Sequence, residues 1–289
     1  MEKIQELPSL IEARPYLQQF RGSILVVKYG GSAMDDPALM DSTLHDLAVV
    51  EAVGIELVVV HGGGKSITRK MKEAGIQATF VSGLRVTDTE SMAIVESVLD
   101  QETNPAIVSG LTALGCPAVG MSGKQVLRVE KSKPLKLDSG EEADLGLVGE
   151  VLFADANMIR DLLEQHKVPV ISPVGCDKNG IAYNTNADLA AMQIAIQLQA
   201  SKLIYISDVP GVLRDRNDAR TVIPTISRPD VERLKEEGIL SGGMLPKVES
   251  ALDALRRGVG KVQFIDGRFR HSLLIELFTA AGCGTEIVD

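Results

Sequence analysis

The segment SILVVKYGGSAM, residues 23–34, joins an apolar run to a lysine and two glycines. Its first part, rich in Val and Ile, has the continuous hydrophobicity of a strand buried on both faces of a sheet. Lys28 lies near the end of this strand, where burial costs free energy unless an anion is close. Gly30 and Gly31 follow and open the backbone to an anion such as phosphate. The alternative is a lysine that reaches solvent from the strand end.

Five further apolar runs alternate with segments of helical period along the chain. Short runs rich in Val and Ile predict buried strands, and their alternation with helices predicts a parallel arrangement. We therefore expect an α/β fold, a three-layer αβα sandwich with a central, mostly parallel sheet. The further runs are 55–60, 117–121, 168–172, 202–207 and 261–265, and the helical segments are 36–53, 88–99, 155–166, 187–199 and 244–257.

Two segments depart from this alternation. Residues 124–153 alternate in hydropathy between turn-forming residues, which predicts antiparallel strands or a hairpin. An apolar stripe at helical spacing precedes the first strand, and it packs either on its own domain or on another subunit. The stripe consists of Leu10, Ala13, Leu17 and Phe20. The expected division is an N-terminal helix in 1–22, an N-terminal lobe in 23–174 and a C-terminal lobe in 175–289.

Composition and charge argue against several classes of function. The 289 residues carry 30 Lys plus Arg against 39 Asp plus Glu, and this net charge of −9 disfavours a broad nucleic-acid surface. No apolar run approaches the roughly 18 residues of a membrane span. Cys116, Cys176 and Cys283 are far apart and odd in number, so we expect them to be reduced and buried, and the protein to be cytoplasmic. Neither nucleic acid nor a membrane is an expected partner.

Glycines stand beside polar groups at the ends of several expected strands. VVKYGGS, VVVHGGGKS, VGMSGK and SDVPG lie at such ends, where open α/β sheets bind ligands. Tight turning explains any single loop, but four loops favour a phosphate site. A second lysine, Lys247, lies in the first turn of the helix that follows Gly242 and Gly243, where the helix dipole disfavours a cation without a nearby anion. A solvated surface lysine is the alternative.

Polar residues near two other helix starts are candidates for substrate contacts. Asn186 and Asp188 begin a helix, and capping together with the helix dipole accounts for both. Asn184 lies outside that helix, so capping does not require it and a substrate contact is an alternative. The planar guanidinium of Arg85 suits a carboxylate in bidentate geometry, although a structural salt bridge is the simpler explanation of this residue alone.

Three familiar motifs are absent. The phosphate-binding P-loop needs glycine where this chain has Val59. HGGG also occurs as an oxyanion loop in esterases, but no GxSxG nucleophile motif accompanies it. No GxGxxG follows the first strand, so the dinucleotide-binding fingerprint is missing too.

Taken together, ten segments in order resemble the amino-acid kinase family, from about residue 23 to the C-terminus. The segments are VVKYGGSAM, VVVHGGGKSI, GLRVTD, VGMSGK, LGLVGEV, PVISPVG, YNTNADLAA, SDVPGVL, GGMLPKVESAL and FIDGR. They are most similar to the branch that acts on N-acetyl-L-glutamate. The resemblance implies transfer of the γ-phosphoryl group of ATP to the side-chain carboxylate of N-acetyl-L-glutamate in arginine biosynthesis, with Mg²⁺ held mainly by the nucleotide phosphates.

The same resemblance implies roles for individual residues. Lys28 and Lys247 would hold and neutralise the phosphoryl group in flight, and Asp188 would orient both lysines. Arg85 and Asn184 would bind the carboxylate and acetamido ends of the substrate. The glycines that would present amides to phosphate and substrate are Gly30, Gly31, Gly63 and Gly64. The expected nucleotide-binding residues are Ser207, Asp208, Val209, Gly211, Leu213, Gly243 and Met244.

Both ends of the chain are similar to those of arginine-inhibited family members. ARPYLQQFRG resembles a mobile helix that interlaces dimers into a hexameric ring, and HSLLIELFTAAGCGTEIV resembles the inhibitor site. The resemblance implies a homo-oligomer, a dimer assembled into a trimer of dimers, that arginine inhibits, with a PII-type nitrogen regulator as a further candidate partner. The candidate arginine-binding residues are Tyr16, His271, Glu276 and Gly284. A solvated position on the last helix is the alternative for Glu276.

Some positions depart from the family pattern and affect the expected shape of the substrate pocket. Ser82 stands where asparagine is frequent, SGKQVL is a short turn, and Asn104 with Pro105 replaces an asparagine–lysine pair. Another enzyme of the same fold, acting on aspartate, glutamate, carbamate or a carrier-linked amino acid, is the first alternative. A non-catalytic arginine sensor is the second, although a sensor has no need of two lysines matched to an acid.

Overall fold

An eight-stranded sheet forms the centre of the computed structural model, which describes residues 10–136, 140–241, 243–280 and 282–289. Gly242 and the first nine residues of the predicted N-terminal helix lie outside this range. In spatial order the strands are β14 (Thr225–Ser227), β16 (Thr285–Val288), β15 (Lys261–Asp266), β13 (Lys202–Ser207), β1 (Ile24–Tyr29), β2 (Glu56–His61), β10 (Val168–Ile171) and β5 (Ala118–Met121). Neighbouring strands are parallel except β15 and β16. The predicted mostly parallel sheet is confirmed.

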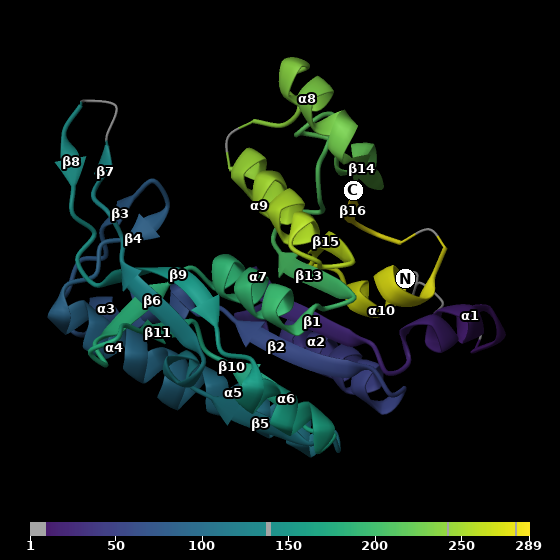
Figure 1. Cartoon of the computed structure of the whole chain (residues 1–289), viewed down its shortest axis with the longest axis horizontal. Coiled ribbons are helices and arrows are strands. Elements are labelled where there is room, and N and C mark those ends of the chain that lie inside the picture. The colour runs from purple at the N-terminus through teal and green to yellow at the C-terminus, as the bar shows by residue number, and fades with distance from the viewer. Residues whose placement is uncertain (1–9, 137–139, 242, 281) are drawn as a thin grey trace.

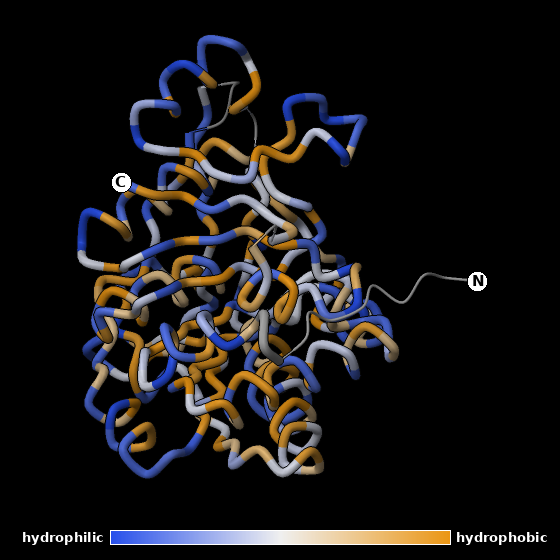
Figure 2. Tube along the Cα trace, turned by 90° about the vertical axis from the view of Figure 1, so that its right-hand side faces the viewer, coloured by the Kyte–Doolittle hydropathy of each residue, from blue (hydrophilic) through white to orange (hydrophobic). Residues whose placement is uncertain are grey.

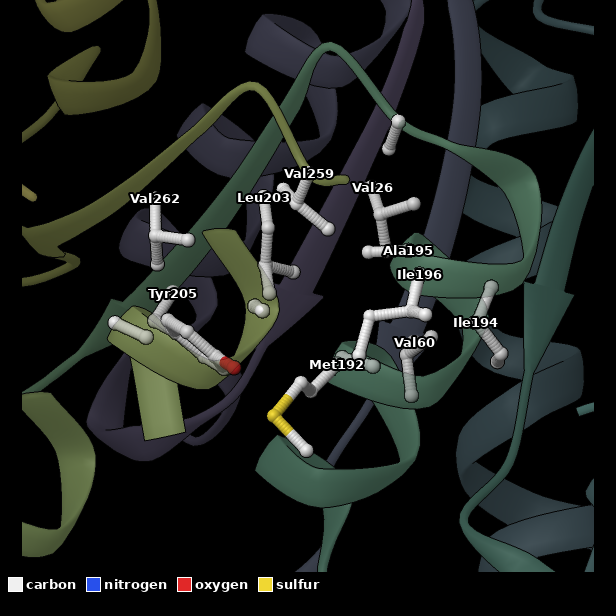
Figure 3. Packing of buried hydrophobic residues seen from close by; sticks show 14 of the residues in the cluster. Val26, Val60, Met192, Ile194, Ala195, Ile196, Leu203, Tyr205, Val259 and Val262 are labelled. Carbon is white, nitrogen blue, oxygen red and sulfur yellow. The ribbon is translucent and has the colours of Figure 1, made fainter. Parts of the chain in front are cut away.

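Helices cover both faces of this sheet, which confirms the three-layer αβα sandwich (Figure 1). One face carries α6 (Asn157–Glu164), α7 (Ala187–Leu198) and α9 (Met244–Arg256), and the other carries α1 (Leu10–Phe20), α2 (Pro37–Ala52), α5 (Asn104–Ala113) and α10 (Ser272–Phe278). Residues along β1 alternate between the two cores, because successive side chains of a strand point to opposite faces. Val26 packs with Val60 and with Ala195 of α7 in Figure 3, whereas Val27 packs on the side of α2.

The six predicted strands and five predicted helices are present, with small shifts at their ends. The predicted helix 88–99 differs most. It begins as α4 (Thr89–Glu96), continues as a π-helical segment, η2 (Ser97–Thr103), and leads directly into α5. The sequence did not predict this π-helical segment, nor the short strands β14 and β16.

Residues 124–153 form antiparallel strands, as predicted. β6 (Leu127–Lys131) pairs with β9 (Val148–Ala154), and together with β11 (Val174–Cys176) and β12 (Ala182–Thr185) they close a small four-stranded barrel. Two hairpins accompany it, β3 (Phe80–Val81) with β4 (Leu84–Arg85), and β7 (Leu135–Lys136) with β8 (Glu142–Ala143). The remaining helices are α3 (Gly64–Glu73), α8 (Arg228–Glu236) and the short η1 (Gly31–Met34), η3 (Gly123–Gln125) and η4 (Ala219–Thr221).

The N-terminal helix α1 packs on its own chain. Ala13 is buried, Leu17 is partly buried in the core cluster that includes α2 and α10, and the Phe20 ring lies 5.1 Å from the ammonium of Lys202. These contacts support the prediction that the apolar stripe packs on its own domain. Figure 2 shows hydrophobic segments concentrated inside the molecule and hydrophilic segments in its outer loops. Within the described ranges, no helix is both long and apolar enough to span a bilayer.

The three cysteines are free thiols, as predicted. Cys116 is buried, but Cys176 and Cys283 are partly exposed, so the prediction of burial is wrong for these two. Cys176 is the last residue of β11, and Cys283 lies in the turn before β16.

Candidate active site

The candidate site lies where β1, β2 and β13 end. These strands are parallel neighbours, and Lys28 is in register with Val60 on one side and Tyr205 on the other. Because parallel strands present their carboxyl ends at one edge, the loops that leave them gather there. Several cavities open at this edge, and two of them contain between them most of the residues predicted from the sequence.

The first cavity has a volume of about 370 Å³ and brings together residues from both halves of the chain. It combines a cation at the end of β1, the glycine loop after β2, the β3–β4 hairpin and the start of α7. Its predicted residues are Lys28, Gly63, Gly64, Arg85, Asn184 and Asp188, and its apolar wall includes Ile67, Leu84, Leu99, Val148 and Pro173.

Lys28 and Asp188 form an ion pair in this cavity. The ammonium lies 3.1 Å from Oδ1 of Asp188, and the two side chains are only 13% and 28% exposed. The alternative of a solvated Lys28 is therefore wrong. Asn186 caps α7 by accepting hydrogen bonds from the amides of Asp188 and Leu189, as predicted. The cap fixes the first turn of α7, so Asp188 is held where its carboxylate reaches Lys28.

At two glycines of this site, an added side chain would displace a neighbouring side chain. A Cβ on Gly30 would lie 2.5 Å from the Lys28 ammonium, and one on Gly63 would lie 2.5 Å from Cδ2 of Leu99. Gly31 has a φ of +78°, in the left-handed region that favours glycine. Gly64 has open space around it and begins α3 without a side-chain cap. The first backbone amides of this helix can therefore donate hydrogen bonds to an anion.

Arg85 is a buried cation beside the same cavity. The residue is 7% exposed, and its guanidinium donates to the carbonyl of Gly64 at 2.9 Å and to Oγ1 of Thr68 at 2.8 Å. It also lies over the ring of Phe80 at 4.6 Å. Within the described residues no carboxylate pairs with it, so the salt-bridge alternative is wrong. Burial lowers the pKa of Arg85, which marks an environment that would gain from an anionic ligand.

Asn184 also lines the first cavity. Its side-chain amide donates to Oγ1 of Thr87 at 3.2 Å, and its backbone amide donates to the carbonyl of Leu147. These contacts orient the side chain at the cavity wall, which is compatible with the predicted substrate contact.

The second cavity, of about 380 Å³, lies between the loop after β13 and the start of α9. Its lining includes Val209, Gly211, Leu213, Gly243 and Met244 from the predicted nucleotide-binding set. Ser207 and Asp208 do not line it. Oδ1 of Asp208 instead accepts hydrogen bonds from the backbone amide and the hydroxyl of Ser32, at 2.6 and 2.5 Å.

Lys247 lines the second cavity rather than the first. Its side chain is partly exposed and, among the residues that the structure describes, makes no ion pair. Asp188 therefore orients Lys28 alone in this structure. The joint action of both lysines stays a prediction, and so does the alternative of a solvated Lys247.

His61 and Asn104 support the glycine loop, although no sequence pattern indicated a role for either residue. Nδ1 of the fully buried His61 lies 2.8 Å from the carbonyl of Gly62, and its Nε2 lies 3.1 Å from the amide nitrogen of Asn104. Asn104 also donates to the carbonyl of Val170 at 2.8 Å. Burial lowers the pKa of His61 to about 4, so the ring is neutral at pH 7. The segment VVVHGGGKS was the available signal, but its glycines were interpreted as a phosphate loop and the histidine received no role of its own.

We expect His61 to make the protein less stable in acid, by about 3 kcal/mol between pH 6.5 and pH 4. In the unfolded chain the imidazole takes up a proton near its ordinary pKa of 6.5, but in the folded protein only near 4. The contribution of neutral His61 to the free energy of unfolding is complete above pH 6.5 and is lost as the pH falls towards 4. Urea denaturation across this range measures it. The variant His61→Gln should lack this part of the pH dependence, and an unchanged slope in the variant would refute the assignment.

The candidate arginine-binding residues lie away from both cavities. Glu276 is partly buried, and its carboxylate accepts from the amides of Cys283 and Gly284, at 2.7 and 3.0 Å, and from the side chain of Gln263. The alternative of a solvated Glu276 is therefore wrong. His271 lies at the start of α10, and its Nδ1 is 2.7 Å from Oδ1 of Asp46.

An acceptor without a partner lies in the same region. Oε1 of Gln263 is buried and, within the described part of the chain, receives no hydrogen bond. A buried carbonyl of this kind costs free energy unless a ligand or water donates to it. Tyr16 belongs to the core cluster between α1 and α10, on the same side of the sheet as His271.

Comparisons with known proteins show the family of the chain. A sequence model of the amino acid kinase family matches residues 23–266. The acetylglutamate kinase of Archaeoglobus fulgidus is 44% identical over 288 residues, which cover 98% of this chain and 99% of that protein.

Solved structures of N-acetylglutamate synthase from Neisseria gonorrhoeae share the fold. One, with coenzyme A and N-acetylglutamate, has a TM-score of 0.82 and 27% identity, covering 96% of this chain and 62% of that chain. Another, with coenzyme A and L-arginine, has a TM-score of 0.77 and 28% identity, covering 96% and 64%. This chain therefore spans less than two thirds of the synthase.

Proposed function

The chain belongs to the amino acid kinase family, and we propose from this premise that it phosphorylates N-acetyl-L-glutamate. The reaction transfers the γ-phosphoryl group of ATP to the side-chain carboxylate and yields N-acetyl-L-glutamyl 5-phosphate in arginine biosynthesis. A full-length relative at 44% identity is an acetylglutamate kinase. The observation that carries the proposal is the first cavity. Its wall has the Lys28–Asp188 pair and the buried guanidinium of Arg85, which has no carboxylate partner among the described residues.

The two cavities suit two substrates with different chemistry. The first cavity would hold the dianionic acceptor, with one carboxylate at Arg85 and the other near Lys28. The second cavity has the mixed apolar and glycine lining that suits a nucleotide, and Lys247 at its edge would reach the phosphates. The acceptor carboxylate is already ionised near neutral pH, so the reaction needs no general base.

Catalysis would then rest on positioning and charge. Phosphoryl transfer gains most from in-line placement and from cations and amides that stabilise the equatorial oxygens. Lys28 and Lys247 supply the cations, and Gly30 and Gly31 leave the backbone accessible. No group of three or more metal-binding side chains occurs within the described residues. Mg²⁺ bound to the nucleotide phosphates would neutralise part of their charge.

We expect the variant Arg85→Gln to raise KM for N-acetyl-L-glutamate by about 10- to 100-fold. The variant loses a charge-assisted, bidentate contact with the α-carboxylate. KM for ATP should stay close to the value of the unmodified protein, because Arg85 does not line the second cavity. Steady-state kinetics with each substrate varied in turn measures this. Arg160→Gln, which removes an exposed arginine on α6, is the control, and an equal rise in both KM values would contradict the assignment.

A panel of acceptors tests the reaction and its alternatives. ATP is incubated with N-acetyl-L-glutamate, L-aspartate, L-glutamate, carbamate or a carrier-linked amino acid, and ADP release is measured. Phosphorylation of N-acetyl-L-glutamate well above the other acceptors is the expected result. Preference for another acceptor would indicate a different enzyme of the same fold, and binding of arginine without any turnover would favour the sensor.

We further propose that arginine inhibits this enzyme at the site formed by Tyr16, His271, Glu276 and Gly284. A guanidinium would find the Glu276 carboxylate and the unpartnered Oε1 of Gln263 there. A solved structure of N-acetylglutamate synthase, 28% identical, contains L-arginine. Deletion of residues 1–20 should abolish inhibition and preserve turnover, since the helix α1 that it removes packs on α10. Undiminished inhibition of the truncated chain would count against the site.

The remaining predictions about organisation are proposals of the same kind. We place acceptor binding in 23–174 and ATP binding in 175–289, with Asn184 and Asp188 of the second part reaching into the first cavity. The helix in 1–22 would join dimers into a trimer of dimers. A PII-type regulator is a further candidate partner, and the free thiols suit the cytoplasm.

A further inference from the structure

We propose that Asp208 is a positioning residue that fixes the Gly30–Gly31 turn for phosphoryl transfer and joins this turn to the nucleotide-binding loop. The inference rests on the proposed kinase function and changes the role expected for Asp208, which the sequence placed among the nucleotide ligands.

The contacts of Asp208 cross from one glycine loop to the other. One carboxylate oxygen, Oδ1, accepts both from the amide of Ser32 and from its hydroxyl, at 2.6 and 2.5 Å. The turn is shaped to allow this approach. Gly31 has a φ of +78°, and a Cβ there would lie 2.5 Å from Oδ1 and 3.2 Å from the Asp208 amide. Any other residue at position 31 would displace the carboxylate and strain the backbone.

The charge of Asp208 argues against a direct contact with phosphate. Desolvation raises the pKa of its carboxyl, but the two hydrogen bonds from Ser32, with Lys65 and Arg268 nearby, hold the pKa below its ordinary value. The group is therefore an anion at neutral pH, and an anion repels a phosphate unless a cation lies between them. The carboxylate instead accepts the two hydrogen bonds from Ser32 and so holds the turn after β1.

The place of Asp208 in the chain connects the two halves of the site. It follows directly on Ser207, the last residue of β13, and the next residues, from Val209 to Leu213, contribute to the wall of the second cavity. A nucleotide that contacts residues 209–213 would therefore influence the position of the turn after β1 through the carboxylate of Asp208. Asp208 is itself exposed, and exposed charged contacts contribute little to folding stability. Its loss should therefore change catalysis more than stability.

Three variants test this role. Asp208→Ala removes the acceptor and should lower kcat about 10-fold, with KM for ATP changed less than about twofold. Asp208→Asn keeps an acceptor oxygen and should restore kcat to within about threefold of the unmodified protein. The double variant Asp208→Ala with Ser32→Ala should be no slower than Asp208→Ala alone, because the Ser32 hydroxyl has already lost its acceptor in Asp208→Ala. Asp161→Asn, on the exposed side of α6, is the control for lost charge.

The opposite pattern would overturn the inference. If Asp208 binds the nucleotide, Asp208→Ala and Asp208→Asn will both raise KM for ATP and weaken binding of the ATP analogue AMPPNP in calorimetry. Hydrogen exchange of the Ser32 amide is independent of turnover and should be faster in Asp208→Ala. If the unmodified protein has no kinase activity, the proposed function fails, and this exchange rate with AMPPNP binding still decides whether Asp208 holds the turn. If Asp208→Ala does not fold, Asp208→Asn and Ser32→Ala are compared instead. The role of Asp208 is refuted if Ser32→Ala leaves kcat unchanged while Asp208→Asn raises KM for ATP.

Discussion

Replacing Lys28 by methionine should lower kcat about 10³-fold, which corresponds to about 4 kcal/mol in the activation barrier. Methionine keeps much of the length of the side chain but removes the cation from the first cavity. The ammonium has been placed there by three features of the fold: the end of β1, the carboxylate of Asp188 at 3.1 Å, and the bare backbone of Gly30. The loss should fall on kcat, because the charge that Lys28 neutralises develops in the transition state.

Single-turnover kinetics with saturating ATP and N-acetyl-L-glutamate measures this effect. Lys178→Met, which removes an exposed lysine from the turn between β11 and β12, is the matched control and should leave kcat unchanged. Adding Asp188→Asn to Lys28→Met should cost little more, because the carboxylate is expected to act through the lysine. A kcat within a few-fold of normal in Lys28→Met would remove Lys28 from the mechanism.

Replacing Lys247 by methionine should lower kcat on the order of 10²-fold. Lys247 lies in the first turn of α9, where the helix dipole disfavours a cation, and, within the described residues, has no carboxylate partner. A phosphate between the two cavities would supply the missing negative charge. Because the side chain lines the second cavity, some loss of ATP affinity should accompany the fall in kcat.

The same helix supplies a control for this prediction. Arg256→Met removes an exposed cation from the last turn of α9, far along the helix from the cavity. It should leave both kcat and KM for ATP close to normal. If Lys247→Met behaved like Arg256→Met, the alternative of a solvated surface lysine would be correct.

The central strands could be predicted because their residues carry the signal themselves. ILVVKY and ELVVVH are apolar on both faces, as strands of a covered parallel sheet must be. The edge strand β14 and its neighbour β16 have only three and four residues, so they lack that signal. The π-helical segment at 97–103 depends on contacts such as those of Asp100 with Ser122 and Ser172, which join distant parts of the chain. Local sequence does not specify it.

The candidate site was predictable in its residue types but not in its pairings. The sequence pointed to Lys28, Asp188 and Arg85, and the structure places all three around one cavity. It could not indicate that no carboxylate in the described part of the chain pairs with Arg85, since that depends on everything packed around the guanidinium. Nor could it separate Asp208 from its neighbours in SDVPG, because the bond to Ser32 arises only when β1 and β13 lie side by side.

The most direct test is a crystal structure with AMPPNP and N-acetyl-L-glutamate bound together. The ammonium groups of Lys28 and Lys247, now at separate cavities, should both lie within about 3 Å of oxygens on the terminal phosphate. The acceptor carboxylate should stand in line with that phosphate. Ligands that fill both cavities while either lysine stays remote from the phosphate would contradict the mechanism.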